Sequence, residues 1–152
     1  MGSRRHMVLF RVRSRLCALP AHLAIETMRP LPLESIGAGP AFVRGVSVIR
    51  GVPTPVVDPA LLLGLTESPE STRFLTVRVG PRQAALAVEA VLGIRNLDDE
   101  TVQTLPPLLR DAGRDLVAAI GAADSELLLI LDSARLVPES MWETLSTTTG
   151  TA

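Results

Sequence analysis

The stretch GVSVIRGVPTPVVD, Gly45 to Asp58, decides the fold that this sequence predicts. Its first half alternates and its second half ends in the apolar run PVV, and both patterns are typical of short strands. Gly51 permits a tight reversal between them, because glycine readily adopts the positive φ that such turns require. We therefore expect a hairpin that holds Arg50 at its corner. No nucleophile, base or metal ligand stands beside Arg50 in the sequence, so this residue is a better candidate for a partner contact than for chemistry.

Composition excludes some classes of partner and allows a buried core. The 152 residues are 47% hydrophobic and 20% charged, which is ample material for a core. Because 15 basic residues nearly balance 16 acidic ones, no overall charge draws the chain to nucleic acid or to an anionic membrane. The longest apolar runs are strand-sized and far shorter than the ~20 residues that cross a bilayer. We expect a cytoplasmic protein.

Cysteine and histidine are scarce in this chain. The single cysteine, Cys17, excludes an intramolecular disulfide and is expected to be a buried strand thiol. Residues 1–6 resemble a tag remnant ahead of a native start at Met7, which leaves His22 as the only native histidine. One histidine is too few for a histidine-based metal site or for a Ser/His/Asp triad with a choice of bases. We expect no metal and no cofactor.

The pattern of the first half of the chain returns in the second half. Residues 9–26 and 74–91 both read as strand, turn, strand, with FRVR at Phe10 echoed by LTVR at Leu75. Each half offers four or five short strands and is too small to bury much surface alone. The sequence therefore predicts an all-β fold of two small antiparallel barrels packed together.

The opening block is also repeated, in residues 116–137. There we expect Gly121 to correspond to Gly51. Arg50 then has no charged counterpart, because Ile120 is the residue before Gly121. Asp58 and Asp132 end matching strands, and each is expected to cap a short helix that follows.

The domain organisation follows from this duplication. Residues 7–138 are expected to form one domain of two barrel subdomains, about 7–66 and 73–138, between which the chain can cross at the ends. Residues 139–152 are expected to form a short helix and a flexible tail. In that helix Trp142 covers a barrel end or, alternatively, anchors a partner, since tryptophan is enriched at binding hot spots.

Two charged residues interrupt runs that otherwise read as core. Glu26 lies in LAIETMR and Arg50 in VIRG. Each side chain either points outward into solvent or meets the other across neighbouring strands as a half-buried ion pair at a recognition groove. Both readings stay open on the sequence alone.

Other candidate chemistry has simpler explanations. The acidic triplet Asp98, Asp99 and Glu100 fits the N-terminus of a helix or turn, where acids suit the exposed amides, and fits no calcium loop. No phosphate-binding loop and no nucleophile elbow is present, so we expect no enzymatic activity. Nucleic-acid binding is disfavoured because the chain has three Phe, one Trp and no Tyr to stack on bases.

With these residues in view, the chain resembles the CheW family of bacterial chemotaxis coupling proteins from about Met7 to Pro138. The family's motifs appear in order: a V-x-E strand, a P-x-F to N-L-R-G block, a P-hydrophobic-hydrophobic-D strand end, a V-D-x-V strand and a closing hydrophobic-L-D. In this chain they are residues 24–26, 40–51, 55–58, 88–91 and 127–132. Each motif is weak alone, and their order and spacing together are specific.

The resemblance implies a non-enzymatic adaptor built of two five-stranded SH3-like barrels with a hydrophobic groove between them. Such a protein couples the cytoplasmic tips of chemoreceptors, the methyl-accepting proteins, to the regulatory domain of the histidine kinase CheA, and is recruited to membrane-associated receptor arrays. Carried over by position, the receptor-facing residues are Glu26, Phe42, Val46 and Arg50. The kinase-facing residues are Leu23, Ala24 and Ile25. Arg110 to Asp115 would contribute to an array contact.

The chain departs from the family pattern at several positions. The usual Asn of the N-L-R-G block is Val48, the usual Leu-Arg after the strand-end Asp is Pro59 and Ala60, and the acid of V-D-x-V is Glu89. Altered groove edges can select a different receptor or kinase. One alternative is a CheW-like module of a non-flagellar pathway, in motility or development, that binds a kinase without a classical receptor. A remote alternative is a small barrel that binds a ligand or nucleic acid.

Overall fold

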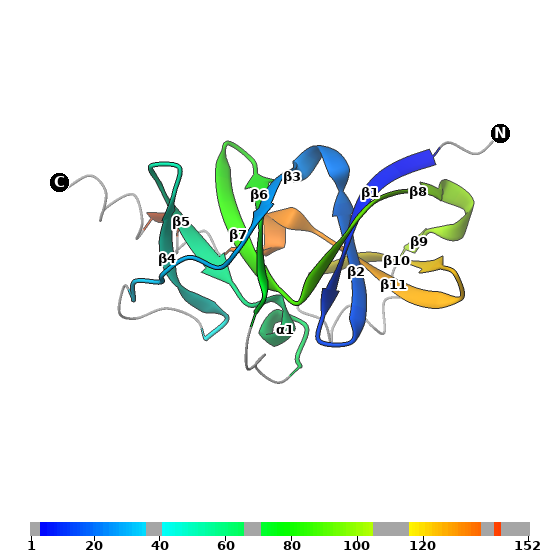
Figure 1. The fold of residues 1–152 in the computed structure, drawn as a ribbon. Coiled ribbons are helices and arrows are strands. Elements are labelled where there is room, and N and C mark those ends of the chain that lie inside the picture. The colour runs from blue at the N-terminus through cyan, green and yellow to red at the C-terminus, as the bar shows by residue number, and fades with distance from the viewer. Residues whose placement is uncertain (1–3, 36–40, 66–70, 105–115, 138–141, 144–152) are drawn as a thin grey trace.

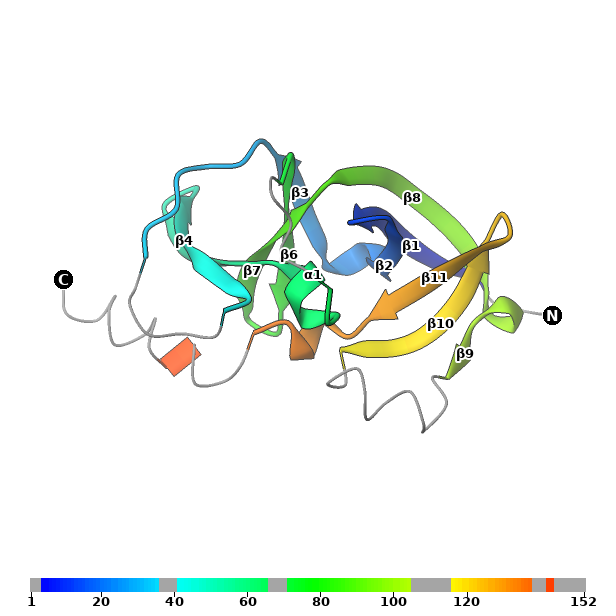
Figure 2. The same ribbon diagram turned by 90° about the horizontal axis from the view of Figure 1, so that it is seen from below.

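The computed structural model describes residues 4–35, 41–65, 71–104, 116–137 and 142–143, which form an all-β fold of two sheets (Figures 1 and 2). The five-stranded sheet joins, in order, β3 (Ala24–Met28), β6 (Arg73–Val79), β7 (Arg82–Val88), β5 (Val52–Val57) and β4 (Val43–Ile49). The six-stranded sheet joins, in order, β8 (Ala90–Asp98), β1 (Arg4–Val12), β2 (Arg15–Pro20), β11 (Glu126–Leu131), β10 (Val117–Ala123) and β9 (Gln103–Thr104). The prediction of an all-β fold in two units is confirmed, with the two-residue β9 as an unpredicted sixth strand.

Helices are short throughout the described residues. They are α1 (Pro59–Leu62) and three 3-10 turns, η1 (Ala21–Leu23), η2 (Asp99–Thr101) and η3 (Ser133–Arg135), and Trp142 and Glu143 are also helical. The acidic triplet lies at the start of η2, as predicted. Among the described residues no helix has the length and apolarity needed to cross a membrane.

Each sheet combines strands from both halves of the chain. The hairpin β6–β7 from the second half joins β3, β4 and β5 from the first half, and the hairpin β1–β2 joins β8, β10 and β11 from the second half. In the repeat, β1 corresponds to β6, β2 to β7, β3 to β8, β4 to β10 and β5 to β11. With these correspondences the order β3-β6-β7-β5-β4 becomes β8-β1-β2-β11-β10, so the duplication is real. The sheets nevertheless do not follow the expected halves, 7–66 and 73–138, because each half exchanges its first hairpin with the other.

The two sheets share one core. In β1, Val8 and Phe10 pack into a cluster that contains residues of both sheets, whereas Met7 and Leu9 pack into a second cluster within the six-stranded sheet. A third cluster, which includes Phe74 of β6, fills the five-stranded sheet. The hairpins β1–β2 and β6–β7 are therefore buried on both faces, which explains why their sequences read as nearly continuous apolar runs.

The predicted hairpin of the opening stretch is present as β4 and β5. Its turn is made by Arg50 and Gly51, whose φ angles are +49° and +78°, the conformation of a tight two-residue hairpin turn. The carboxylate of Asp58 then accepts a hydrogen bond from the Ala60 amide at 3.0 Å, and α1 begins at Pro59. Asp132 caps η3 in the same way through the Ala134 amide at 3.0 Å.

The expected match between Gly51 and Gly121 is wrong. Gly121 lies inside β10 opposite Leu128, and the turn of the second hairpin is made by Asp124 and Ser125, with φ angles of +49° and +71°. Aspartate enters the left-handed region more readily than most residues, so this turn needs no glycine. The structural counterpart of Arg50 is therefore Asp124, and the inference that Arg50 has no charged counterpart is also wrong.

Candidate functional site

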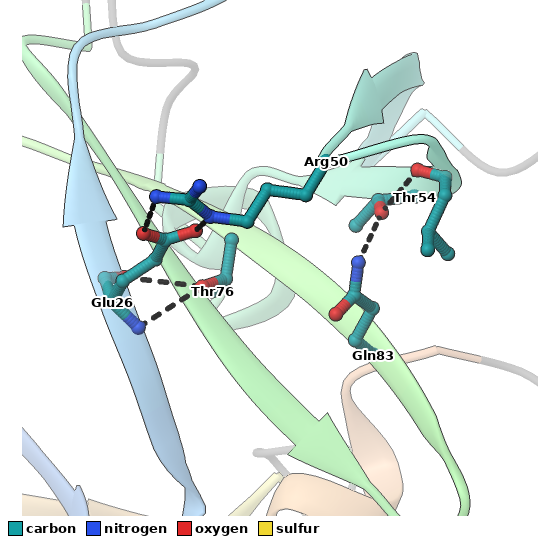
Figure 3. A network of polar contacts seen from close by, with 6 residues as sticks. Glu26, Arg50, Thr54, Thr76 and Gln83 are labelled. Atoms are coloured by element: carbon teal, nitrogen blue, oxygen red, sulfur yellow. Dashed lines mark hydrogen bonds and ion pairs between the residues drawn. The ribbon is translucent and has the colours of Figure 1, made fainter.

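Glu26 and Arg50 form a two-pronged ion pair (Figure 3). The Arg50 Nε donates to Glu26 Oε1 at 2.7 Å and its Nη2 donates to Oε2 at 2.8 Å. The Glu26 side chain is 25% exposed and that of Arg50 is 78% exposed. The two residues therefore form the predicted ion pair, with only Glu26 half-buried, whereas the prediction that they lie on neighbouring strands is wrong and the recognition groove stays a prediction.

The pair links strands that are not neighbours. β3 carries Glu26 and β4 ends beside Arg50, and these strands are the two opposite edges of the five-stranded sheet. The segment that follows β3 also reaches β4, through two backbone hydrogen bonds of 2.9 Å between Glu34 and Val46 and through the Ser47 hydroxyl, which donates to the Pro32 carbonyl at 2.8 Å. The sheet is curled enough to bring Arg50, at the end of β4, into contact with Glu26 of β3, although the two residues are 24 positions apart.

Polar residues that the sequence analysis did not select hold this corner in place. The Thr76 hydroxyl accepts from the Glu26 amide and donates to the Glu26 carbonyl, both at 3.1 Å. On the hairpin side, Gln83 donates to the Thr54 hydroxyl at 2.8 Å and Thr54 donates to the Val52 carbonyl at 2.9 Å (Figure 3). The sequence does show Thr76 as a polar residue inside an apolar strand. Its hydrogen-bond partner depends on strand pairing, which the sequence does not reveal.

The electrostatics of the pair keep both groups charged. The hydrogen bonds from Arg50, and then its positive charge, lower the pKa of Glu26, while partial burial opposes the shift. The hydrogen bond to Glu26 raises the pKa of Arg50. Near neutral pH the corner therefore presents a fixed guanidinium whose orientation is set by the carboxylate.

Two exposed apolar residues lie close to Arg50 in the same hairpin. Val48 and Val52 stand two residues before and after Arg50, and they are 63% and 45% exposed. We call Glu26, Val48, Arg50 and Val52 the corner site. An oriented cation on a hairpin that also exposes two valines offers both an apolar contact and a directional charge, which are the ingredients of a protein-binding surface. In the described part of the chain no cluster of His, Cys, Asp or Glu could hold a metal ion.

Two residues assigned to the receptor-facing set lie away from the corner. Phe42 precedes β4, at the end opposite to Arg50, and its carbonyl accepts from the Asp58 amide at 2.7 Å. Val46 is buried in the shared core and supports β4 from inside. The structure therefore brings Glu26 and Arg50 together and does not bring Phe42 or Val46 to them.

The residues assigned to a kinase-facing side lie on η1 and β3. Leu23 and Ala24 are half-buried, whereas Ile25 is 44% exposed. Ile25 sits at a register shift between Ala24 and Glu26, and its exposed side chain follows the alternation of burial along β3. Arg110 to Asp115, assigned to an array contact, lie outside the described residues.

Both the fold and the sequence are similar to those of known CheW proteins. The structure resembles the crystal structure of the scaffolding protein TtCheW from Thermoanaerobacter tengcongensis, with a TM-score of 0.76, 22% sequence identity, and coverage of 87% of this chain and 90% of that one. The chain is also 25% identical over 138 residues to the probable chemotaxis protein CheW of Rhizobium etli, covering 90% of this chain and 89% of the relative. It is 24% identical over 136 residues to the chemotaxis protein CheW of Rhizobium meliloti, covering 88% of each.

A family model places the chain among these proteins directly. The model of the CheW-like domain matches residues 6–141, which is most of the sequence. The chain belongs to the CheW-like domain family.

Proposed function

We propose that this protein is a non-enzymatic adaptor that couples chemoreceptors to the histidine kinase CheA in a bacterial chemosensory array. The observation that carries the proposal is the corner site, where Glu26 orients the exposed guanidinium of Arg50 on a hairpin that also exposes Val48 and Val52. Membership of the CheW-like family and relatives named as chemotaxis proteins support the same function.

The corner site suits the tip of a receptor. A signalling contact of modest area needs a few apolar anchors and a well-placed charge, and the exposed Val48 and Val52 beside Arg50 provide them. Because Glu26 already orients the guanidinium, less conformational entropy is lost when a partner carboxylate or carbonyl binds it. We assign this surface to the cytoplasmic tip of the receptor.

Ile25 offers a separate contact for the kinase. It is an exposed apolar side chain at the strand irregularity next to Glu26, and we assign it, with the half-buried Leu23 and Ala24 behind it, to the regulatory domain of CheA. The adaptor would then work in the cytoplasm, recruited to receptor arrays through these two contacts.

Co-purification with a receptor tip fragment and a CheA regulatory domain tests the proposal. Wild type should retain both partners, Arg50→Ala should lose the receptor fragment, and Ile25→Asp should lose the kinase domain. Arg11→Ala is the matched control, because Arg11 forms a comparable ion pair with Glu126 in the other sheet.

Other outcomes point to other functions. Retention of the kinase domain alone by the wild type would favour a CheW-like module that serves a kinase without a classical receptor. Loss of neither partner in either variant would contradict the site assignment. Binding of neither partner, together with a midpoint shift on heating with nucleotides or an oligonucleotide, would favour a small ligand-binding or nucleic-acid-binding barrel.

A further inference from the structure

The corner site rests on a buried hydroxyl of the neighbouring strand. Thr76 of β6 is buried and is paired with Glu26 in the register between β3 and β6. Its hydroxyl accepts a hydrogen bond from the Glu26 amide and donates one to the Glu26 carbonyl, both at 3.1 Å (Figure 3). One side chain therefore holds both backbone groups of the residue that orients Arg50.

An irregularity in β3 explains why a hydroxyl is useful at this point. Ala24 of β3 is paired with Val77 of β6. The next pair, Glu26 with Thr76, lies two residues further along β3 but only one residue away along β6, so Ile25 is an extra residue. Such an extra residue disrupts the hydrogen-bond ladder and bends the strand that carries it. Thr76 binds the strand again directly after the irregularity, and so fixes the backbone from which the Glu26 side chain extends.

The other repeat has a different side chain at this position. In the echoed motifs FRVR and LTVR, Thr76 corresponds to Arg11. The Arg11 guanidinium forms an ion pair with Glu126, in which its Nη2 donates to Oε1 at 2.9 Å. The second barrel therefore forms without a threonine here. A hydroxyl that binds the neighbouring backbone is a property of the first corner and not a requirement of the barrel.

The direction of the Arg50 guanidinium depends on this support. The Arg50 side chain is largely exposed, and its Nε and Nη2 both donate to the Glu26 carboxylate. Glu26 can orient the guanidinium only as well as its own backbone is held. We propose that Thr76 is a buried positioning residue for receptor binding, whose hydroxyl fixes the backbone from which Glu26 orients Arg50. This inference rests on the proposed assignment of the corner site to the receptor tip.

The substitution Thr76→Val tests this role, because it removes the hydroxyl and nearly keeps the shape of the side chain. The Glu26 midpoint in a carboxyl-detected NMR titration should rise toward its value in Arg50→Gln, since a looser pair lowers the pKa of Glu26 less. The Thr76 hydroxyl bonds to the backbone of Glu26, so the carboxyl midpoint reports on the ion pair. Calorimetric titration with a receptor tip fragment should show about fivefold weaker binding, the effect of one net hydrogen bond.

Two further variants separate positioning from a general loss of stability. Thr76→Ser keeps the hydroxyl and should return both the Glu26 midpoint and receptor binding close to the wild-type values. Asp132→Ala removes the cap of η3, outside the corner site, and should leave both readings unchanged although it also costs stability. If Thr76→Val does not fold, Thr76→Ala gives the same two readings with a smaller side chain.

Four results would overturn the proposal. They are a folded Thr76→Val chain with the wild-type Glu26 midpoint, wild-type receptor binding in a chain whose midpoint has risen, a Thr76→Ser chain that behaves like Thr76→Val, and an equal rise in Asp132→Ala. Failure of the proposed function gives a different result, because a wild-type chain would then not bind the receptor fragment. The Glu26 midpoint is measured without any partner, and in that case it still decides whether Thr76 positions the ion pair.

Discussion

Arg50 and Asp124 occupy equivalent turns of the two repeats with opposite charge. Both have a φ of +49°, and each follows the last residue of the first strand of its hairpin. Arg50 binds Glu26 of β3, and Asp124 accepts a hydrogen bond from Arg95 of β8 at 2.9 Å, where β3 and β8 are repeat counterparts. The duplicated fold therefore uses the same corner-to-edge ion pair twice with reversed polarity, so its two corners cannot bind the same partner in the same way.

The pair at the first corner predicts a measurable titration. Arg50 lowers the pKa of Glu26 below the ordinary glutamate value of about 4.3. Because the folded-state pKa is depressed, the stabilisation by this pair is complete above the unfolded-state pKa and is lost as the pH falls through the folded-state pKa. A carboxyl-detected NMR titration should place the Glu26 midpoint below the ordinary value, and Arg50→Gln should move it upward.

Glu126 provides the control for that titration. Its pKa is lowered in the same way by Arg11 in the other sheet, so its midpoint should not respond to Arg50→Gln. A Glu26 midpoint at or above the ordinary value in the wild type would show that the pair does not form in solution.

The two capping aspartates should differ in their contribution to stability. Asp58 is buried, caps α1 and also accepts from the Arg44 Nη2 at 2.8 Å, whereas Asp132 caps η3 and is only half-buried. Removing one partner of a buried ion pair costs about 3 to 5 kcal/mol, and removing a cap alone costs about 1 kcal/mol. Urea unfolding should therefore show a much larger loss for Asp58→Ala than for Asp132→Ala. Equal losses would mean that the Arg44–Asp58 pair contributes nothing.

Gly45 is required where β4 lies against the segment that follows β3. Its φ is +152°, and a Cβ at this position would stand 2.7 Å from the Glu34 carbonyl oxygen, which bonds to the Val46 amide. Gly45→Ala should destabilise the protein by about 1 to 3 kcal/mol, through the collision and the backbone strain. Gly51→Ala, with no atom within 4 Å of the added Cβ, tests the strain alone and should cost less. The reverse order in thermal unfolding would refute this role for Gly45.

The single cysteine should be unreactive until the protein unfolds. Burial raises the pKa of Cys17 to about 12, outweighing the opposing charges of Arg15 and Arg11. At pH 8 the native thiolate fraction is then roughly three orders of magnitude below that of an unfolded cysteine. Ellman's reagent should label the native chain slowly and the chain in guanidinium promptly. Rapid labelling of the native protein would place Cys17 outside the core.

Much of the local structure is predictable from the sequence, because it rests on local chemistry. The Arg50–Gly51 turn, the Gly80–Pro81 turn between β6 and β7, and the caps at Asp58 and Asp132 all depend on residues within a few positions of one another. Alternation and apolar runs likewise identify the strands, and the repeated pattern identifies the duplication.

The exchange of hairpins between the halves is not predictable in this way. Whether β1 and β2 pair with strands of their own half or with β8 and β11 depends on contacts between residues far apart in sequence. The glycine match failed for a related reason, since Asp124 and Ser125 make a turn that glycine usually marks. Phe42 and Arg50 stand at opposite ends of the same strand, β4, and an extended strand keeps its two ends far apart. Which part of the sheet each end contacts depends on how the sheet curls, and the strand pattern alone does not reveal this.

The most direct test of the account is a charge-reversal cycle at Glu26 and Arg50, followed by calorimetric titration with a receptor tip fragment. Glu26→Arg and Arg50→Glu should each weaken binding at least tenfold, about 1.4 kcal/mol, and the double reversal should not recover the loss, because it places a carboxylate where the partner meets the guanidinium of Arg50. The same reversals at Arg11 and Glu126 are the matched control and should leave binding unchanged. Single reversals at Glu26 and Arg50 that bind as tightly as the wild type would contradict the account.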